Sequence, residues 1–118
     1  MKLFFYSLLA SMSIVSVHTQ SMAYAQEPHI IEIHAHRFSF EPSEITLKRD
    51  EPVTLRLISD DVSHSLMIPD LGVNQEIKKG KPADVNVDPK SVGDFHGQCG
   101  HFCGGGHGSM TFVVHVKD

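Results

Sequence analysis

The fold is most clearly encoded in Val53-Thr54-Leu55-Arg56-Leu57-Ile58, where apolar and more polar side chains alternate. Alternation with a period of two residues is typical of a β-strand that buries one face and exposes the other. The polar run Ser59-Asp60-Asp61 follows directly and reads as a turn. The centre of the chain is therefore expected to be a strand that packs one side against a core.

Similar short runs occur on both sides of this strand, separated by proline, glycine or aspartate. Runs without helical spacing are expected to be strands at His29–Phe40, Glu44–Leu47, Ser65–Ile68, Ala83–Val87, Gly93–Gln98 and Met110–Val116. One irregular turn is expected at Val73–Lys79. About seven short strands at this spacing predict an all-β Greek-key sandwich or barrel.

Composition limits the classes of function. The chain has 118 residues, which is the size of one domain, and 14 acidic side chains against 10 basic ones. A formal net charge of −4 argues against nucleic acid as a ligand, because proteins that bind nucleic acid carry clustered lysine and arginine. The same charge argues against a basic helix on a membrane surface.

The first 25 residues read as a secretory signal peptide. Lys2 precedes an apolar run, Leu3–Val17, that is short for a membrane-spanning helix, and Ala23-Tyr24-Ala25 has the A-x-A pattern of a cleavage site. We therefore expect cleavage after Ala25, with residues 26–118 forming the exported domain; the alternative is a retained N-terminal anchor. Removal of Lys2 would change the formal net charge from −4 to −5.

The residues with distinctive chemistry are concentrated in Cys99–Met110, between two expected strands. Two thiols, an imidazole and a thioether in this run, together with His64 upstream, form a soft donor set that suits copper. Two cysteines, rather than one, would allow both sulfurs to bridge two copper ions. The alternatives are a Cys99–Cys103 disulfide, a zinc site, and a Met110 that is simply part of the core.

The run Gly97-Gln98-Cys99-x3-Cys103-Gly104-x2-His107-x2-Met110 resembles the CuA motif of cytochrome c oxidase subunit II and of nitrous oxide reductase. The stretch from Asp61 to Gly72, with its histidine, proline and Leu-Gly pair, is similar to the first-ligand segment of that family. The resemblance implies a cupredoxin fold and two copper ions. It implies that His64 and His107 cap one copper each, that Cys99 and Cys103 bridge, that Met110 is a weak axial ligand, and that the His101 carbonyl is a further contact.

The chain also departs from the family pattern. His101 stands where oxidases have a glutamate, and the chain has no tryptophan. The residues before the domain are also not expected to supply the two membrane helices that usually precede it. The resemblance thus implies an exported carrier of single electrons, soluble or extrinsic to an oxidase, and not an enzyme by itself except as an electron-accepting subunit. Its partner would be a cytochrome or an oxidase. The alternative is a periplasmic copper chaperone that serves a copper acceptor protein.

Residues near the expected ligands are expected to have supporting roles. Asp61 and Ser65 are expected to orient His64, although a solvated turn is an equally simple reading of Asp61. Leu71 is expected to lie across the loop from His107 and to form part of an apolar docking patch. The two histidines His34 and His36 share one face of the first strand, where they are either exposed polar residues or a second, weaker copper site.

Overall fold

The computed structural model describes residue 16, residues 29–100 and residues 104–118. The predicted signal peptide therefore lies outside the described residues, apart from Ser16. The strands are β1 (His29–His36), β2 (Ser39–Glu41), β3 (Glu44–Lys48), β4 (Val53–Ser59), β5 (His64–Ile68), β6 (Val73–Ile77), β7 (Ala83–Val87), β8 (Gly93–Gln98) and β9 (Thr111–Lys117). Two short 3₁₀ turns, η1 (Pro69–Leu71) and η2 (His107–Ser109), complete the described secondary structure.

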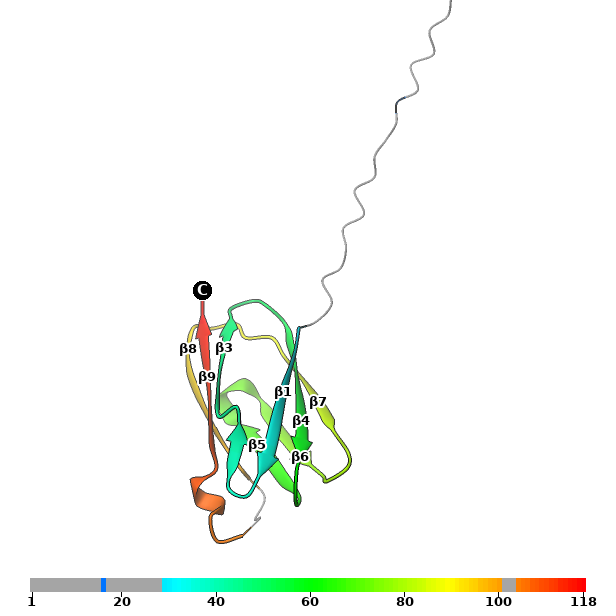
Figure 1. The fold of residues 1–118 in the computed structure, drawn as a ribbon. Coiled ribbons are helices and arrows are strands. Elements are labelled where there is room, and N and C mark those ends of the chain that lie inside the picture. Colours follow the sequence, from blue (N-terminus) through cyan, green and yellow to red (C-terminus); the bar gives the residue numbers. More distant parts are fainter. Residues whose placement is uncertain (1–15, 17–28, 101–103) are drawn as a thin grey trace, which may run out of the picture.

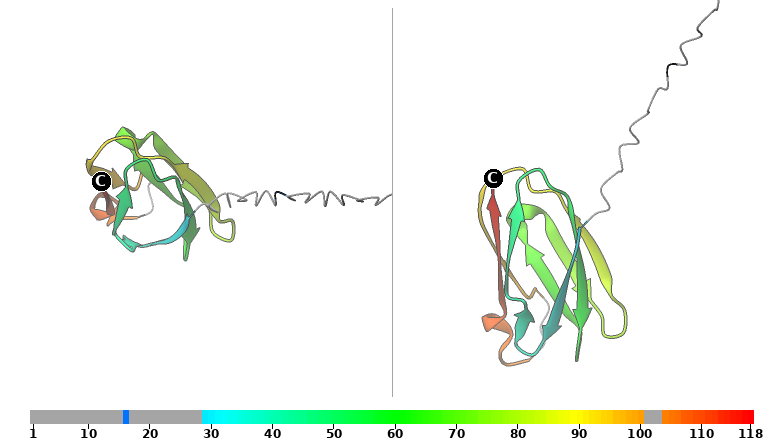
Figure 2. Two further views of the ribbon diagram at one scale, coloured as in Figure 1. Left: turned by 90° about the horizontal axis from the view of Figure 1, so that it is seen from above. Right: turned by 45° about the horizontal axis from the view of Figure 1, so that its top comes forward.

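The strands form two sheets that pack face to face (Figures 1 and 2). One sheet has the order β2-β1-β4-β7, and the other has the order β3-β9-β8-β5-β6. The β1–β4 and β3–β9 pairs are parallel, whereas the remaining pairs are antiparallel. Strands that neighbour each other in a sheet are thus often distant in sequence, as in a Greek key.

The core lies between the inner faces of the two sheets. In β4 the side chains of Val53, Leu55 and Leu57 are buried, so the alternation seen in the sequence is confirmed. The rings of Phe40 in β2 and Phe112 in β9 meet edge to face across the sandwich, with centroids 5.9 Å apart. Such aromatic pairs stabilise a core beyond the contribution of their buried area.

Three connections come together at one end of the sandwich, where β1, β4 and β8 end (Figure 1). They are the β1–β2 turn at Arg37–Phe38, the β4–β5 turn at residues 60–63, and the segment from Cys99 to Met110 that joins β8 to β9. The C-terminus lies at the opposite end. Because β5 and β8 are antiparallel neighbours, the start of β5 lies beside the end of β8.

The predicted all-β Greek-key class is confirmed, with two differences in detail. The structure has nine strands in its described part instead of about seven. Val73–Ile77 forms β6, where an irregular turn was predicted, and the run predicted as one strand at His29–Phe40 is divided by the Arg37–Phe38 turn. Within residues 29–100 and 104–118, no helix is long and apolar enough to span a bilayer.

Candidate metal centre

The predicted ligands fall on the connections at this one end. His64 is the first residue of β5, Cys99 follows β8 directly, and Met110 lies between η2 and β9. The backbone of His107 begins η2. His101 and Cys103 lie outside the described residues, as does the side chain of His107.

Two backbone contacts join the ligand-bearing segments. The Gly100 N–H donates a hydrogen bond to Ser65 Oγ at 2.9 Å, which ties the residue after Cys99 to the residue after His64. The Cys99 N–H donates to the Met110 carbonyl at 3.1 Å. A Cβ at Gly100 would lie 3.0 Å from Ser65 Oγ and 3.1 Å from Met67 Sδ, so glycine permits this close approach. The structure therefore brings the His64, Cys99 and Met110 segments together, and Ser65 takes part through its contact with Gly100.

His64 is fully buried, and its two ring nitrogens differ sharply. Nε2 lies 2.7 Å from Asp61 Oδ1, so this nitrogen carries the proton of the hydrogen bond when Asp61 is ionised. Nδ1 is buried and has no hydrogen-bond partner among the described residues. A buried polar atom without a partner is unusual and needs an explanation. An imidazole that is held through one nitrogen, with the other buried and without a hydrogen-bond partner among the described residues, fits a metal ligand.

Asp61 is an acceptor for three donors. Its carboxylate receives hydrogen bonds from the Arg37 N–H at 2.7 Å, from the Val62 N–H at 2.6 Å, and from His64. Burial by itself would raise the pKa of this carboxyl group, but the hydrogen bonds from Arg37, His64 and Val62 outweigh it and lower the pKa to about 2. Asp61 is therefore ionised at neutral pH, and the structure places it where it orients His64.

The sulfur donors are surrounded by the apolar core. Cys99 and Met110 are 2% and 0% exposed, and both belong to the main hydrophobic cluster, which also contains Leu66 and Phe112. An environment without water strengthens metal–ligand electrostatics and limits reorganisation when charge changes. Leu66 is itself completely buried.

The structure gives only part of the predicted donor set. Among the residues with described side chains, no three His, Cys, Asp or Glu side chains converge in a way that could hold a metal ion. Three of the six predicted ligands, His101, Cys103 and His107, have side chains outside this set. His34 lies in another cluster: Nδ1 is 2.8 Å from Asp60 and Nε2 is 2.7 Å from Glu32, and these hydrogen bonds raise its pKa.

Sequence reasoning missed Phe38 and misplaced Leu71. Phe38, in the β1–β2 turn, packs on the backbone of Gly104 and Gly106 in the β8–β9 loop, which carries predicted ligands (the metal loop). Leu71 lies elsewhere, at a cavity that it lines with Phe95 and the segment after β7, so the expected position across the loop from His107 is wrong. Leu71 sits a full strand length from His64, because β5 and part of η1 lie between them. The sequence contains only a weak signal for Phe38. It is one aromatic residue at a turn, and the glycines that it contacts, Gly104 and Gly106, lie far along the chain.

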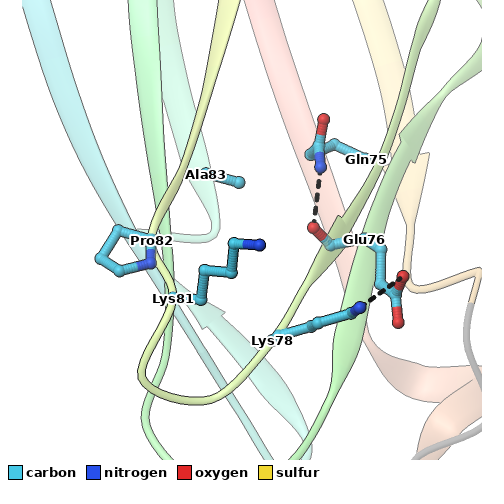
Figure 3. A pocket seen from close by; sticks show the side chains of 6 residues that line it. All are labelled: Gln75, Glu76, Lys78, Lys81, Pro82 and Ala83. Carbon is cyan, nitrogen blue, oxygen red and sulfur yellow. Dashed lines mark hydrogen bonds and ion pairs between the residues drawn. The ribbon is translucent and has the colours of Figure 1, made fainter.

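Two surface cavities lie in the described part of the chain, and neither is lined by His64, Cys99 or Met110. One, of about 200 Å³, lies beside the β6–β7 turn (Figure 3), where Lys78 Nζ is 4.0 Å from Glu76 Oε2. Its lining consists of Gln75, Glu76, Lys78, Lys81, Pro82 and Ala83. The other, of about 220 Å³, is the cavity at Leu71. The described predicted ligands His64, Cys99 and Met110 thus lie apart from both linings.

The chain is similar to known copper-site domains. It matches the family described as the periplasmic domain of cytochrome c oxidase subunit II over residues 11–117. Among solved structures, it is similar to the periplasmic domain of cytochrome oxidase subunit II from Bradyrhizobium japonicum, with 16% identity over 76% of this chain and 84% of that one and a TM-score of 0.71. It is similar to a chain of a heme-copper terminal oxidase dimer, with 24% identity, a TM-score of 0.69, and coverage of 75% of this chain and 65% of that one.

A third similar structure is auracyanin A, a "blue" copper protein from the green photosynthetic bacterium Chloroflexus aurantiacus. Identity is 14%, the TM-score is 0.64, and the match covers 77% of this chain and 100% of that one. At these levels of identity the structural matches establish the fold, and they confirm the predicted cupredoxin architecture. The chain spans slightly less than two thirds of the terminal-oxidase chain that it matches.

Proposed function

Because this chain belongs to the family of periplasmic domains of cytochrome c oxidase subunit II, we propose that it transfers single electrons through a binuclear, CuA-like copper centre. The family confirms that the domain is exported, and it supports copper as the metal. The observation that carries the proposal is His64, whose Nδ1 is buried and unpartnered among the described residues while Asp61 holds Nε2. Metal-ligating histidines usually have this arrangement, in which the ring nitrogen that does not bind the metal donates to a carboxylate.

The resemblance to the family supports the proposed role of each donor. His64 and His107 would each cap one copper, Cys99 and Cys103 would bridge the two, and Met110 would be a weak axial ligand. The His101 carbonyl would supply a further contact. Imidazole, thiolate and thioether donors together suit copper better than zinc, which has no use for Met110.

Bound copper would accept and release one electron, and the chain's own residues would keep the site nearly unchanged while it does so. Asp61 fixes the ring of His64, the Ser65–Gly100 hydrogen bond fixes the two ligand-bearing segments, and the core around Met110 excludes water. A site that reorganises little favours electron transfer over bond chemistry. We therefore propose a redox partner, a cytochrome or an oxidase, and no substrate of the domain's own.

Residues 1–25 are proposed to be the export signal, with residues 26–118 as the mature domain. The N-terminal sequence of the protein recovered from the periplasm would begin at Gln26 if cleavage occurs after Ala25. An intact N-terminus in a membrane fraction would instead identify residues 1–25 as a retained anchor.

Copper loading followed by metal analysis and electron paramagnetic resonance (EPR) tests the centre itself. We expect two copper ions per chain and, in the oxidised form, one unpaired electron shared by both. One copper with an ordinary mononuclear spectrum would contradict the binuclear proposal, and two cysteines that resist thiol reagents until reduction would favour the disulfide.

The family match favours electron transfer over the copper-chaperone alternative. The two can be separated by mixing the loaded protein with a reduced cytochrome c and, separately, with a Cu(I) acceptor protein. A carrier exchanges electrons repeatedly and keeps its copper, whereas a chaperone transfers the metal faster than it turns over electrons.

A further inference from the structure

We propose that Phe38 is a positioning residue of the metal loop: its ring fixes the path of Gly104–Gly106, and its turn holds that loop against the His64 segment. The contact with the loop stands on the structure alone. Its consequence for copper rests on the proposed function above.

The ring lies directly on the glycine backbone. A Cβ built at Gly106 would overlap Cγ and Cδ2 of Phe38 and would lie 2.9 Å from Cδ1. A Cβ at Gly104 would lie 2.9 Å from Cε1 and 3.0 Å from Cζ. By contrast, a Cβ at Gly105 or at Gly108 would meet no atom within 4 Å. The requirement for glycine at position 106 thus comes from one side chain, 68 residues away in the sequence.

Arg37, the other residue of the same turn, is connected to the proposed ligand His64 through Asp61. The Arg37 N–H, next to Phe38, donates to Asp61 Oδ2 at 2.7 Å. The second oxygen of that carboxylate is 2.7 Å from His64 Nε2. The Arg37–Phe38 turn therefore contacts both halves of the proposed centre, His64 through Asp61 and the β8–β9 loop through the ring.

The contact with Gly106 also continues toward the sulfur ligands. The Gly106 carbonyl accepts hydrogen bonds from the Ser109 N–H at 3.1 Å and from Ser109 Oγ at 2.7 Å. Ser109 is followed by Met110, whose carbonyl accepts from the Cys99 N–H. Displacement of Gly106 by loss of the ring would thus reach Met110 and the backbone of Cys99.

Phe38 itself is not part of the main core, since 38% of the residue is exposed. A Phe38→Ala chain should therefore fold. The matched control is Ile30→Ala, which removes another exposed apolar side chain, 47% exposed, from the same strand-turn unit. Phe38→Tyr keeps the ring and serves as the conservative rescue.

The first arm of the test uses the metal-free protein and does not depend on copper. In the wild-type background, Gly106→Ala should lower the melting temperature by several degrees, because overpacking at the ring is destabilising. In the Phe38→Ala background the same substitution should cost much less. Gly105→Ala is the control and should act alike in both backgrounds. An equal cost of Gly106→Ala in both backgrounds would overturn the proposed contact.

The second arm measures copper. Phe38→Ala should weaken Cu(I) binding about ten- to a hundredfold in competition with a chromogenic chelator, as loss of supporting contacts does at other metal sites. Its EPR spectrum should also change, while Ile30→Ala and Phe38→Tyr match the wild type. Affinity and spectrum of Phe38→Ala equal to those of Ile30→Ala would refute the positioning role. If the wild type bound no copper, the proposed function would fail, and the metal-free arm would still decide the contact.

Discussion

The carboxylate of Asp61 offers the sharpest test of how the His64 segment is held. Asp61→Asn keeps the size of the side chain but replaces one acceptor oxygen by a donor group. The two carboxylate oxygens together receive hydrogen bonds from Arg37 N–H, Val62 N–H and His64. An amide cannot accept at both positions, so at least one of these three donors would lose its partner.

The size of the effect follows from the pKa of Asp61, which lies at about 2 instead of the usual 3.8. Such a lowering corresponds to about 2.4 kcal/mol of folding stability at neutral pH. The side chain is 31% exposed, so solvent screening reduces this to about 2 kcal/mol. For a domain of this size, the loss should lower the melting temperature of the metal-free protein by about 8 °C or more.

The pH dependence has a definite sign. Because the pKa of the folded state is lowered, the stabilisation is complete above the unfolded value of 3.8 and is lost as pH falls through about 2. The difference between wild type and Asp61→Asn should therefore be full at pH 7 and should shrink between pH 4 and pH 2. His64 and Arg37 provide the contacts that disappear when Asp61 is protonated.

The assay is thermal and urea unfolding followed by far-ultraviolet circular dichroism. Fluorescence is unsuitable, because the chain has no tryptophan and both tyrosines, Tyr6 and Tyr24, precede the predicted cleavage site. The matched control is Asp84→Asn, since Asp84 pairs with Arg56 at an exposed position and should matter far less. A loss at Asp61 no larger than at Asp84, or a difference that persists unchanged at pH 2, would refute the assigned role.

Three further outcomes are expected. Cys99→Ser should abolish the paired copper centre, because a hydroxyl cannot replace a bridging thiolate, and EPR of the loaded protein would show it; a retained shared-electron spectrum would contradict bridging. Met110→Leu should keep two coppers and fold with a loss below about 1.5 kcal/mol, but shift the reduction potential measured by voltammetry; loss of all copper would count against a weak axial role. Hydrogen bonding to Asp94 raises the pKa of His115, so NMR titration should give a value above 6.5 that falls on Asp94→Asn; an unchanged value would exclude that pairing.

The sequence predicted the strands whose alternation is strong and left out the one whose alternation is weak. β4 and β9 bury an apolar residue at every second position, so their faces could be assigned directly. In β6 only Val73 and Ile77 are buried, with the polar Gln75 between them, and two apolar residues are too few to reveal the period. The burial of Val73 and Ile77 follows from the pairing of β6 with β5, opposite Ile68 and His64, which the local sequence does not reveal.

The division between β1 and β2 was missed for a related reason. Ala35 and Phe40 are both buried, and both lie in stretches of alternating pattern on either side of the turn. An apolar side chain at the turn itself, Phe38, makes the two strands look continuous. The structure shows that this residue leaves the alternation because it packs on the metal loop and not on the core.

The ligands of the proposed centre could be predicted from the residue types in the sequence, whereas the contacts that hold the ligand-bearing segments in place could not. Thiols, imidazoles and a thioether in one run indicate a soft metal wherever the chain places them. The contact of Phe38 with Gly106 depends on which turns the two sheets bring to the same end, and no local pattern records that. This explains why Leu71 was misplaced: it is near His64 in sequence, but β5 runs away from the site.

The sheet topology explains why three connections meet at one end of the sandwich and can contact one another. β4 leads into the His64 turn, β8 leads into Cys99, and β1 leads into the Arg37–Phe38 turn, so each connection leaves the sandwich where the others do. The strands fix where each connection starts but not how it lies against its neighbours. That choice is made by a few contacts. Asp61 joins the β4–β5 turn to the β1–β2 turn, Ser65 joins the start of β5 to the β8–β9 loop at Gly100, and Phe38 joins the β1–β2 turn to the same loop. Rigidity at the proposed centre therefore comes from cross-links between the turns, and a change in any one should be felt at the other two.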